Sequence, residues 1–218
     1  MIIIGLTDLH GNGDYVEMIA AELTEADLVV IAGDITHFGG WSEAQSLLEH
    51  VGQYNSNILA VAGNCDKSGV SEYMAERQIL LNCNCVEFQN TAFVGVGGSL
   101  PCPGHTPNEC PDGNFAACLE QLEAKIPPGR PVVFVSHQPP AQTAVDLVGG
   151  SHTGSVAIRD FIIRNQPVLA ISGHIHEAIG TDKIGETVLV NPGPLRHGRY
   201  GRIELAEKGA KITLCDVS

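Results

Sequence analysis

The chain of 218 residues has few basic residues and no long apolar run. It carries 12 basic against 25 acidic side chains, a formal net charge of −13. A surface of that sign repels the phosphate backbone of nucleic acids and anionic lipids, so extended nucleic-acid binding is not expected. The longest apolar runs have the length of strands, which argues against a membrane-spanning helix.

Residues 1–6 are apolar but too short for the hydrophobic region of a secretion signal, and no basic stretch precedes them. We therefore expect a cytoplasmic protein. The seven cysteines are an odd number, and no Cys-x-x-Cys pair occurs among them. We expect reduced, mostly buried thiols rather than a disulfide framework or a structural zinc site.

Short β-branched runs alternate with helical patterns, which indicates βαβ units and a partly parallel sheet. No linker or repeat divides the chain, so we expect a single α/β domain over residues 1–218. A long loop rich in proline and glycine, residues 97–113, is either functional or a surface excursion. The expected strands are 2–7, 28–32, 58–62, 92–96, 132–136 and 168–172. The expected helices are 13–23, 42–51, 114–125 and 155–165, and a meander of strands at 179–183, 187–190, 199–204 and 211–217 closes the chain.

Five of the expected strands end in residues that can bind a metal. In open α/β sheets ligands bind at the carboxyl ends of strands, so we expect these side chains to meet. Asp8 and His10, like His174 and His176, are one residue apart, and on an extended backbone each pair points the same way. The five strand ends are Asp8-Leu9-His10, Gly33-Asp34, Gly63-Asn64-Cys65-Asp66, His137 and Gly173-His174-Ile175-His176.

These strand ends offer two carboxylates, one amide oxygen and four imidazoles as ligands. Such a set suits Mn, Fe, Zn, Co or Ni, and two divalent cations can share it when one carboxylate bridges them. A single Asp or His after a strand is commonly a cap or a turn residue. Five such ends in one chain are better explained by a metal centre.

The series Asp8-x-His10, Gly33-Asp34, Gly63-Asn64-x-Asp66, His137 and Gly173-His174-x-His176 resembles the calcineurin-like metallophosphoesterase superfamily from residue 2 to about residue 200. The fragments Asn64-Cys65-Asp66 and Asn191-Pro192-Gly193 resemble its small, single-domain bacterial and archaeal phosphodiesterase branch. The resemblance implies a four-layer α/β/β/α sandwich with two mixed central sheets and a dinuclear metal centre at the strand ends. It also implies that Asp8, His10 and His176 bind one metal, that Asn64, His137 and His174 bind the other, and that Asp34 bridges them.

The resemblance implies a hydrolase that cleaves a small phosphodiester through a metal-bridging hydroxide. Two divalent ions, manganese first and Fe, Zn, Ni or Co as alternatives, lower the pKa of water and hold the phosphate for in-line attack. Their charge exceeds that of Asp8 and Asp34, which attracts a phosphoester despite the acidic surface. The alternatives are a phosphomonoesterase or protein phosphatase of the same fold, a nuclease, and a non-catalytic scaffold for protein partners. A homo-oligomer is left open.

Cys65 stands where many superfamily members have a histidine that protonates the leaving group. A free thiol has a pKa near ~8.5, so Cys65 is either a weak acid or a small apolar filler. Asp66 is expected to orient a ligand or the leaving-group region, and His37 to reach the substrate. With Cys65 they form the candidate catalytic set.

Candidate substrate contacts are Asn64, His105 in the proline-rich loop, and His152. Each of the two histidines also has a purely structural interpretation. Ser155 is expected to cap a helix whose free amides could bind an anion. Arg196, His197 and Arg199 are expected to add positive charge near the cleft.

Overall fold

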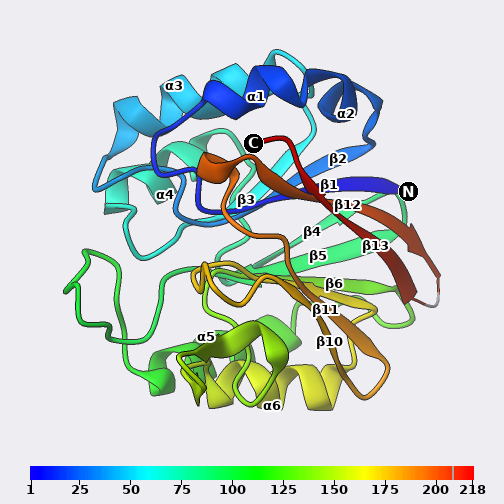
Figure 1. The fold of residues 1–218 in the computed structure, drawn as a ribbon. Helices are drawn as coiled ribbons and strands as arrows, with labels where there is room; N and C mark the ends of the chain where they lie inside the picture. The colour runs from blue at the N-terminus through cyan, green and yellow to red at the C-terminus, as the bar shows by residue number, and fades with distance from the viewer. Residues whose placement is uncertain (208) are drawn as a thin grey trace.

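The strands of the computed structural model, which describes residues 1–207 and 209–218, form two sheets that lie face to face (Figure 1). The first sheet contains, in spatial order, β13 (Gly209–Asp216), β12 (Arg199–Ala206), β1 (Ile2–Leu6), β2 (Leu28–Ala32) and β3 (Ile58–Val61). The second contains β10 (Gly180–Ile184), β11 (Thr187–Asn191), β9 (Leu169–Ile171), β6 (Val132–Ser136), β5 (Thr91–Val96) and β4 (Asn84–Phe88). A short hairpin, β7 (Leu147–Val148) and β8 (Ser151–His152), stands apart from both sheets.

Helices cover the outer face of each sheet (Figure 1). On the first sheet lie α1 (Asp14–Met18), α2 (Ala20–Glu25), α3 (Trp41–Gly52) and α4 (Ser68–Glu76). On the second lie α5 (Asp112–Glu123) and α6 (Val156–Asn165). Two 3₁₀ turns, η1 (Ala144–Asp146) and η2 (Leu195–His197), complete the described elements. None of the described helices is long and apolar enough to cross a bilayer.

Alternation along the strands builds this layered core. Successive side chains of a strand point to opposite faces, so a strand covered on both sides must be apolar throughout. In β2, Val29 and Ile31 pack under the helices, while Leu28 and Val30 pack between the two sheets. The second sheet repeats the pattern, and its outer face packs on α5 and α6. The expected four-layer α/β/β/α sandwich with two mixed sheets is confirmed.

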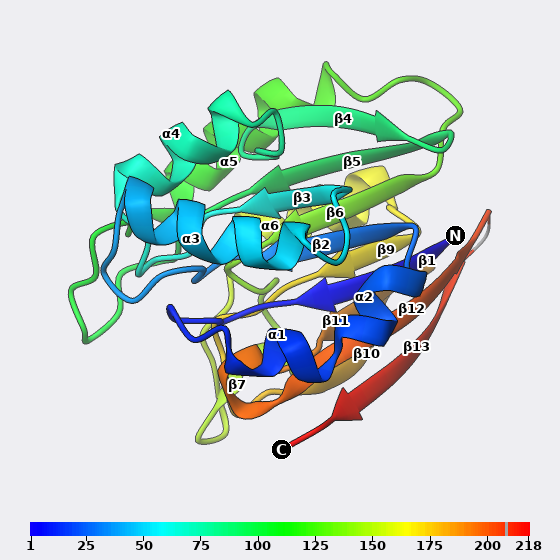
Figure 2. The same ribbon diagram turned by 90° about the horizontal axis from the view of Figure 1, so that it is seen from above.

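The parallel strands of both sheets run in the same direction. β1, β2 and β3 pair in parallel, as do β5, β6, β9 and β11. Seen from above, the arrowheads of β1, β3 and β5 point to the same side (Figure 2). The carboxyl ends of strands from both sheets therefore meet at one edge of the sandwich.

The expectation of reduced thiols is wrong for two cysteines. Cys83, just before β4, forms a disulfide with Cys118 of α5, and the other five cysteines are free. The sequence analysis missed β4, the strand that carries residue 83 to the edge of the second sheet, where α5 packs. Without that strand, nothing in the spacing of the cysteines brings these two together.

Candidate metal centre

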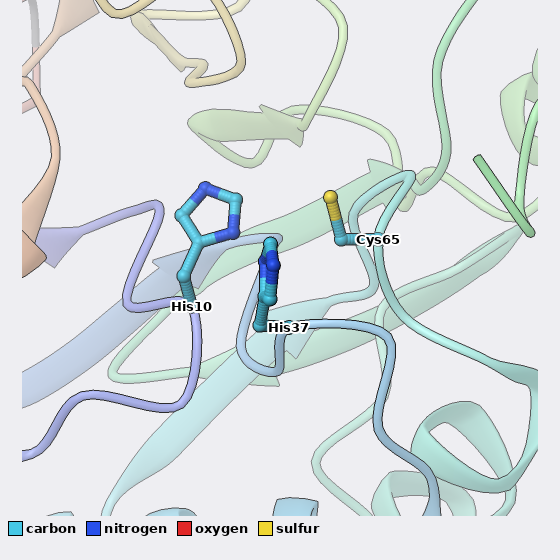
Figure 3. A group of neighbouring side chains, drawn as sticks. All are labelled: His10, His37 and Cys65. Atoms are coloured by element: carbon cyan, nitrogen blue, oxygen red, sulfur yellow. The ribbon is translucent and has the colours of Figure 1, made fainter. Parts of the chain in front are cut away.

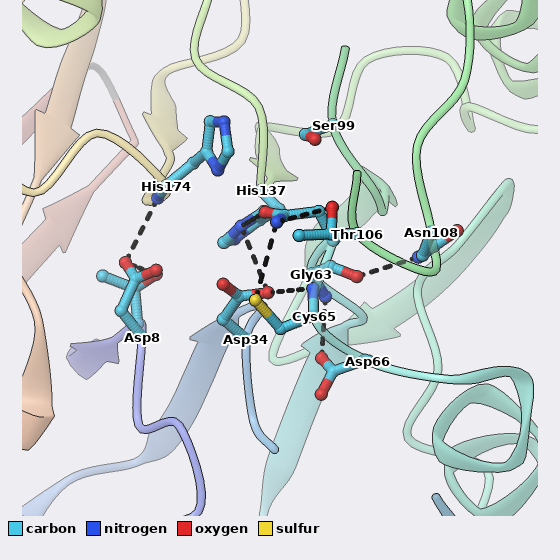
Figure 4. A network of polar contacts seen from close by, with 12 residues as sticks. Asp8, Asp34, Gly63, Cys65, Asp66, Ser99, Thr106, Asn108, His137 and His174 are labelled. Carbon is cyan, nitrogen blue, oxygen red and sulfur yellow. Dashed lines mark hydrogen bonds and ion pairs between the residues drawn. The ribbon is translucent and has the colours of Figure 1, made fainter. Parts of the chain in front are cut away.

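All seven predicted metal ligands lie at the edge where the strands of both sheets end. Ligand atoms of Asp8, His10 and His176 lie within 4.8 Å of one another, and those of Asp8, Asp34 and His137 do so as well. His174 faces His137, with 5.0 Å between their ring centroids. Figure 4 shows how closely the loops after β1, β2, β3, β6 and β9 approach one another. The sequence therefore predicted correctly which side chains come together.

The local backbone differs from the extended form expected for the Asp-x-His and His-x-His pairs. Asp8, His10 and His174 have φ values of 53°, 49° and 68°, and Asp34 has 48°. These left-handed turns are held by loop-to-loop hydrogen bonds, from the amide of Asp8 to Gly33 O (3.1 Å) and from that of His10 to Asp34 O (2.8 Å). Strain of this kind persists where surrounding structure imposes it, and it is common at functional sites.

His137 shows that this edge is built to hold positive charge. Its Nδ1 lies 2.8 Å from the carbonyl oxygen of Ala32, which only accepts, so Nδ1 carries the proton. Its Nε2 then points a lone pair at two more acceptors, Asn64 Oδ1 at 2.8 Å and Asp34 Oδ1 at 3.4 Å. Burial alone lowers the pKa of His137, but the charges of Asp34 and Asp8 outweigh it and raise the pKa. The lone pair of Nε2 and those of the two oxygens converge in a buried place. Because they repel one another, a proton or a cation must lie between them.

His10 supplies a second sign of a cation site. Its side chain is 8% exposed, and both ring nitrogens are buried without a hydrogen-bond partner. Nε2 lies 3.8 Å from Asp8 Oδ1 and 3.5 Å from Asp34 Oδ2. Burial lowers the pKa of His10 to about 4, so the ring is neutral at pH 7 and can donate an electron pair.

Asp8 and His176 form the corner next to His10. Asp8 accepts hydrogen bonds from Thr7 Oγ1 (2.8 Å) and the amide of His174 (3.1 Å), and its Oδ1 lies 3.1 Å from His176 Nε2. Arg196 Nη2 lies 3.3 Å from the other nitrogen of His176, and a guanidinium only donates. The His176 proton therefore sits on Nε2, between His176 and Asp8, where a cation can replace it.

The buried carboxylates of Asp8 and Asp34 carry more negative charge than the side chains around them balance. Burial raises the pKa of Asp34, and repulsion from Asp8 adds to the effect. Burial also opposes ionisation of Asp8, but the hydrogen bond from His176 and the charge of His137 lower its pKa below the ordinary value. Burial lowers the pKa of His174 to about 3, which leaves its ring neutral. The neutral imidazoles of His10 and His174 beside these buried carboxylates fit divalent cations as the missing charge.

Asp66 and the backbone of Cys65 hold Asp34 and its turn in place. Both oxygens of Asp66 are occupied: they accept from the amides of Ile35, Thr36 and Gly63 and from the Thr36 hydroxyl, at 2.7–3.1 Å. Asp66 thereby fixes the turn that carries Asp34. The amide of Cys65 donates to Asp34 Oδ1 at 2.8 Å, and burial, with the charge of Asp34, raises the pKa of the Cys65 thiol.

The 97–113 loop packs on the turn that carries Asn64. Thr106 is the residue of this loop that contacts the Asn64 side chain. Asn64 Nδ2 donates to Thr106 Oγ1 at 3.0 Å, and Asn108 Nδ2 donates to Gly63 O at 2.9 Å. His105 is exposed, and only its backbone amide makes a described hydrogen bond. The sequence analysis named His105 in this loop, and the residue that contacts Asn64 is its neighbour Thr106.

The remaining candidates have different surroundings. His37 is exposed, with its ring centroid 5.6 Å from that of His10. His152 Nδ1 lies 2.6 Å from Oδ1 of the buried Asp146, and no described contact links its ring to a predicted ligand.

The residues expected to bring positive charge or bind an anion near the site differ in where they lie. Three residues were expected to add positive charge. Arg196 faces His176, Arg199 pairs with Asp216 at 3.3 Å, and His197 is the last residue of η2. Ser155 does cap α6, but the expected anion site is filled by this chain itself. Asp112 accepts from the Ser155 hydroxyl (2.5 Å) and from the amide of Ala157 (3.2 Å).

A two-sheet sandwich with an Asp, His and Asn cluster at its strand ends is the architecture that the resemblance to phosphoesterases implies. The chain belongs to the calcineurin-like phosphoesterase family, whose sequence model matches residues 1–178. It is 35% identical to an uncharacterised protein of Methanocaldococcus jannaschii over 206 residues, 92% of this chain and 91% of that protein.

Solved structures agree on the fold. A protein from Thermus thermophilus is 18% identical, has a TM-score of 0.78, and matches 100% of this chain and 99% of its own. A dimetal phosphatase from Danio rerio is 12% identical, has a TM-score of 0.60, and matches 100% and 99% of the two chains.

Proposed function

We propose that the protein is a phosphodiesterase that hydrolyses small phosphodiesters at a dinuclear metal centre. The observation that carries the proposal is the convergence of electron-pair donors at the strand ends, above all His137 Nε2 and the unpartnered His10 Nε2, both of which face oxygens of Asp34. Asp8, His10 and His176 would hold one cation, Asn64, His137 and His174 the other, and Asp34 would bridge them. Bound divalent cations supply Lewis acidity toward the phosphoryl oxygens and a water nucleophile at neutral pH.

The chain's own residues hold and orient this centre. Asp66 fixes the turn of Asp34, and the Thr106 hydroxyl accepts from the amide nitrogen of Asn64, so that Oδ1 of Asn64 faces His137. Because Asp66 has no free acceptor, we assign it a positioning role instead of contact with substrate. Arg196, whose Nη2 lies 3.3 Å from Nδ1 of His176, places positive charge beside the proposed centre and favours an anionic phosphoester.

The preference for diesters rests on the sequence Asn64-Cys65-Asp66, which resembles the small phosphodiesterase branch of the family. A buried thiol whose pKa is raised is a poor proton donor, so we expect either kind of ester to be cleaved best when its leaving group needs little protonation. His37, exposed beside His10, is the side chain best placed to contact the leaving group from solvent. Since all seven ligand positions are filled by metal-binding residues, we favour an enzyme over a non-catalytic scaffold.

The test compares hydrolysis of bis(p-nitrophenyl) phosphate and p-nitrophenyl phosphate by metal-stripped protein titrated with Mn²⁺. We expect metal-dependent turnover with the diester preferred, and its loss in Asp34→Ala together with bound metal. Asp27→Asn is the matched control, because Asp27 bonds to the amide of Ile2 at the start of β1, away from the ligands. Hydrolysis by Asp34→Ala with two metals bound would refute the ligand assignment, and a preference for the monoester would refute the substrate class.

A further inference from the structure

A second group of metal-binding side chains lies beside the proposed dinuclear centre. Ligand atoms of His10, His37 and Cys65 lie within 4.8 Å of one another (Figure 3). The three residues come from the loops after β1, β2 and β3. Backbone hydrogen bonds join these loops, from Gly11 N to Ile35 O (2.9 Å) and from Phe38 N to Cys65 O (3.1 Å). The cluster is therefore held together by the fold.

A buried ring nitrogen of His10 indicates that this cluster binds a ligand. Its Nε2 faces Asp8 and Asp34, and the dinuclear centre accounts for that nitrogen alone. Nδ1 is also buried and has no partner. In Figure 3 the ring nitrogen nearer the backbone lies on the side of His37 and Cys65. A buried imidazole nitrogen without a partner is costly, so it requires a proton acceptor or a cation on this side.

The donor set differs in kind from that of the dinuclear centre. Two imidazoles and one thiolate suit a soft or borderline cation, above all Zn²⁺, whereas the proposed dinuclear centre contains no sulfur. We propose that His10, His37 and Cys65 form an accessory site for a soft divalent cation such as Zn²⁺. Since His37 is exposed and Cys65 is buried, the cation enters from solvent past His37.

Binding at this site exchanges a proton for a cation and involves no redox change. Without a cation the Cys65 thiol carries its proton, which is the ordinary state of a cysteine at neutral pH. The cation accepts electron pairs from the Cys65 sulfur and the two imidazoles, and the thiol proton leaves to solvent. With the dinuclear centre also filled, His10 would offer one ring nitrogen to each site, and its remaining proton would be lost to solvent.

Occupancy of the accessory site has a regulatory consequence, which rests on the proposed function. It removes His37 from contact with the leaving group, so Zn²⁺ inhibits the Mn²⁺-loaded enzyme. The site itself does not depend on catalysis, and its test reads absorption instead of turnover.

Cobalt(II) replaces Zn²⁺ as the probe, because a thiolate ligand adds an intense near-ultraviolet charge-transfer band that nitrogen and oxygen ligands do not give. Metal-stripped protein, handled without reductant so that the Cys83–Cys118 bond stays closed, is titrated with Co²⁺. We expect the band to appear, to bleach when Zn²⁺ displaces Co²⁺, and to be absent in Cys65→Ser. His37→Ala should weaken Co²⁺ affinity at the band by more than the ~10-fold that loss of an outer partner costs.

Cys85→Ser is the matched control, since Cys85 is a half-buried free thiol in β4, and it should keep the band. Absence of the band in the wild type, or its survival in Cys65→Ser, overturns the proposal. Loss of the band in Asp34→Asn also overturns it, because the thiolate would then belong to the dinuclear centre. His37 is exposed, so His37→Ala is expected to fold even where Cys65→Ser does not, and unchanged affinity in that variant refutes the site.

Discussion

Replacing Asp34 with asparagine should separate the energetic cost of the buried charge from the benefit of bound metal. The Asp34 side chain is 3% exposed, and its Oδ1 accepts the amide of Cys65, a hydrogen bond that asparagine can keep. Burial and Asp8 raise the pKa of Asp34, which means that its ionised form is costly when no cation is present. In EDTA at pH 7 we therefore expect Asp34→Asn to be at least as stable as the wild type.

Manganese should reverse this order. Each cation at 100 times its Kd adds about 2.7 kcal/mol to the free energy of unfolding, so two cations add about 5 kcal/mol. In a chain of this size 1 kcal/mol shifts Tm by ~2–4 °C, which predicts an increase of roughly 10–20 °C for the wild type. Asp34→Asn should gain less than half of that, because the bridging charge is gone.

Thermal unfolding followed by circular dichroism, in EDTA and in excess Mn²⁺, measures both effects, with Asp27→Asn as the control. A variant that is less stable than the wild type in EDTA yet gains the same Mn²⁺ shift would refute the reasoning.

Three further outcomes can be measured directly. Asp66→Asn cannot accept from all four donors, so we expect a loss of at least ~1–3 kcal/mol in urea unfolding and weaker Mn²⁺ binding in calorimetry. Hydrogen bonds from Cys102 and Thr106 lower the pKa of Glu109 from 4.5 to about 2, so the stability that Glu109 gives the loop is present above pH 4.5 and is lost as the pH falls toward 2. The protection of amides 99–110 from hydrogen exchange, taken relative to their intrinsic exchange rates, should fall over that interval, and this fall should be absent in Glu109→Gln. Cys118→Ser opens the disulfide, whose partners are 35 residues apart, and should lower the free energy of unfolding by about 4 kcal/mol in guanidinium, whereas serine at the half-buried free Cys85 should leave it nearly unchanged.

The elements that the sequence predicted are those with a strong apolar pattern. β2, Leu28–Ala32, is buried at every position and was predicted with the same bounds. β4 was missed because it is an edge strand whose residues are half-buried or exposed, which leaves no continuous run to detect. α4 was missed for a related reason: it begins with Ser68 and Gly69, and buries only three side chains. The predicted helix over 13–23 divides at Ile19 into α1 and α2.

The position of the candidate metal centre was predictable because its side chains follow strands whose parallel pairing brings their ends together. The hydrogen bonds that hold these side chains in place could not be predicted from the sequence. Thr106 reaches Asn64 through a loop whose path depends on Ser99 and Asn108, and no local pattern distinguishes it from its neighbour His105. The four bonds of Asp66 come largely from backbone amides, which carry no signature in the sequence. Asp112, which fills the α6 terminus, lies 43 residues from Ser155.

His10 connects the two metal sites argued for this chain, and this makes them distinguishable by choice of metal. On one side its Nε2 faces the carboxylates of Asp8 and Asp34, a hard oxygen environment that Mn²⁺ accepts readily. On the other side lie His37 and the Cys65 thiol, which favour Zn²⁺. A histidine at this position, where many superfamily members have one, would give up the sulfur ligand and with it the preference for a soft cation. We therefore expect Mn²⁺-dependent turnover of this chain to fall on addition of Zn²⁺ and to resist Zn²⁺ in Cys65→Ser, whatever its basal rate. Equal sensitivity of the two proteins would place the inhibitory zinc in the dinuclear centre.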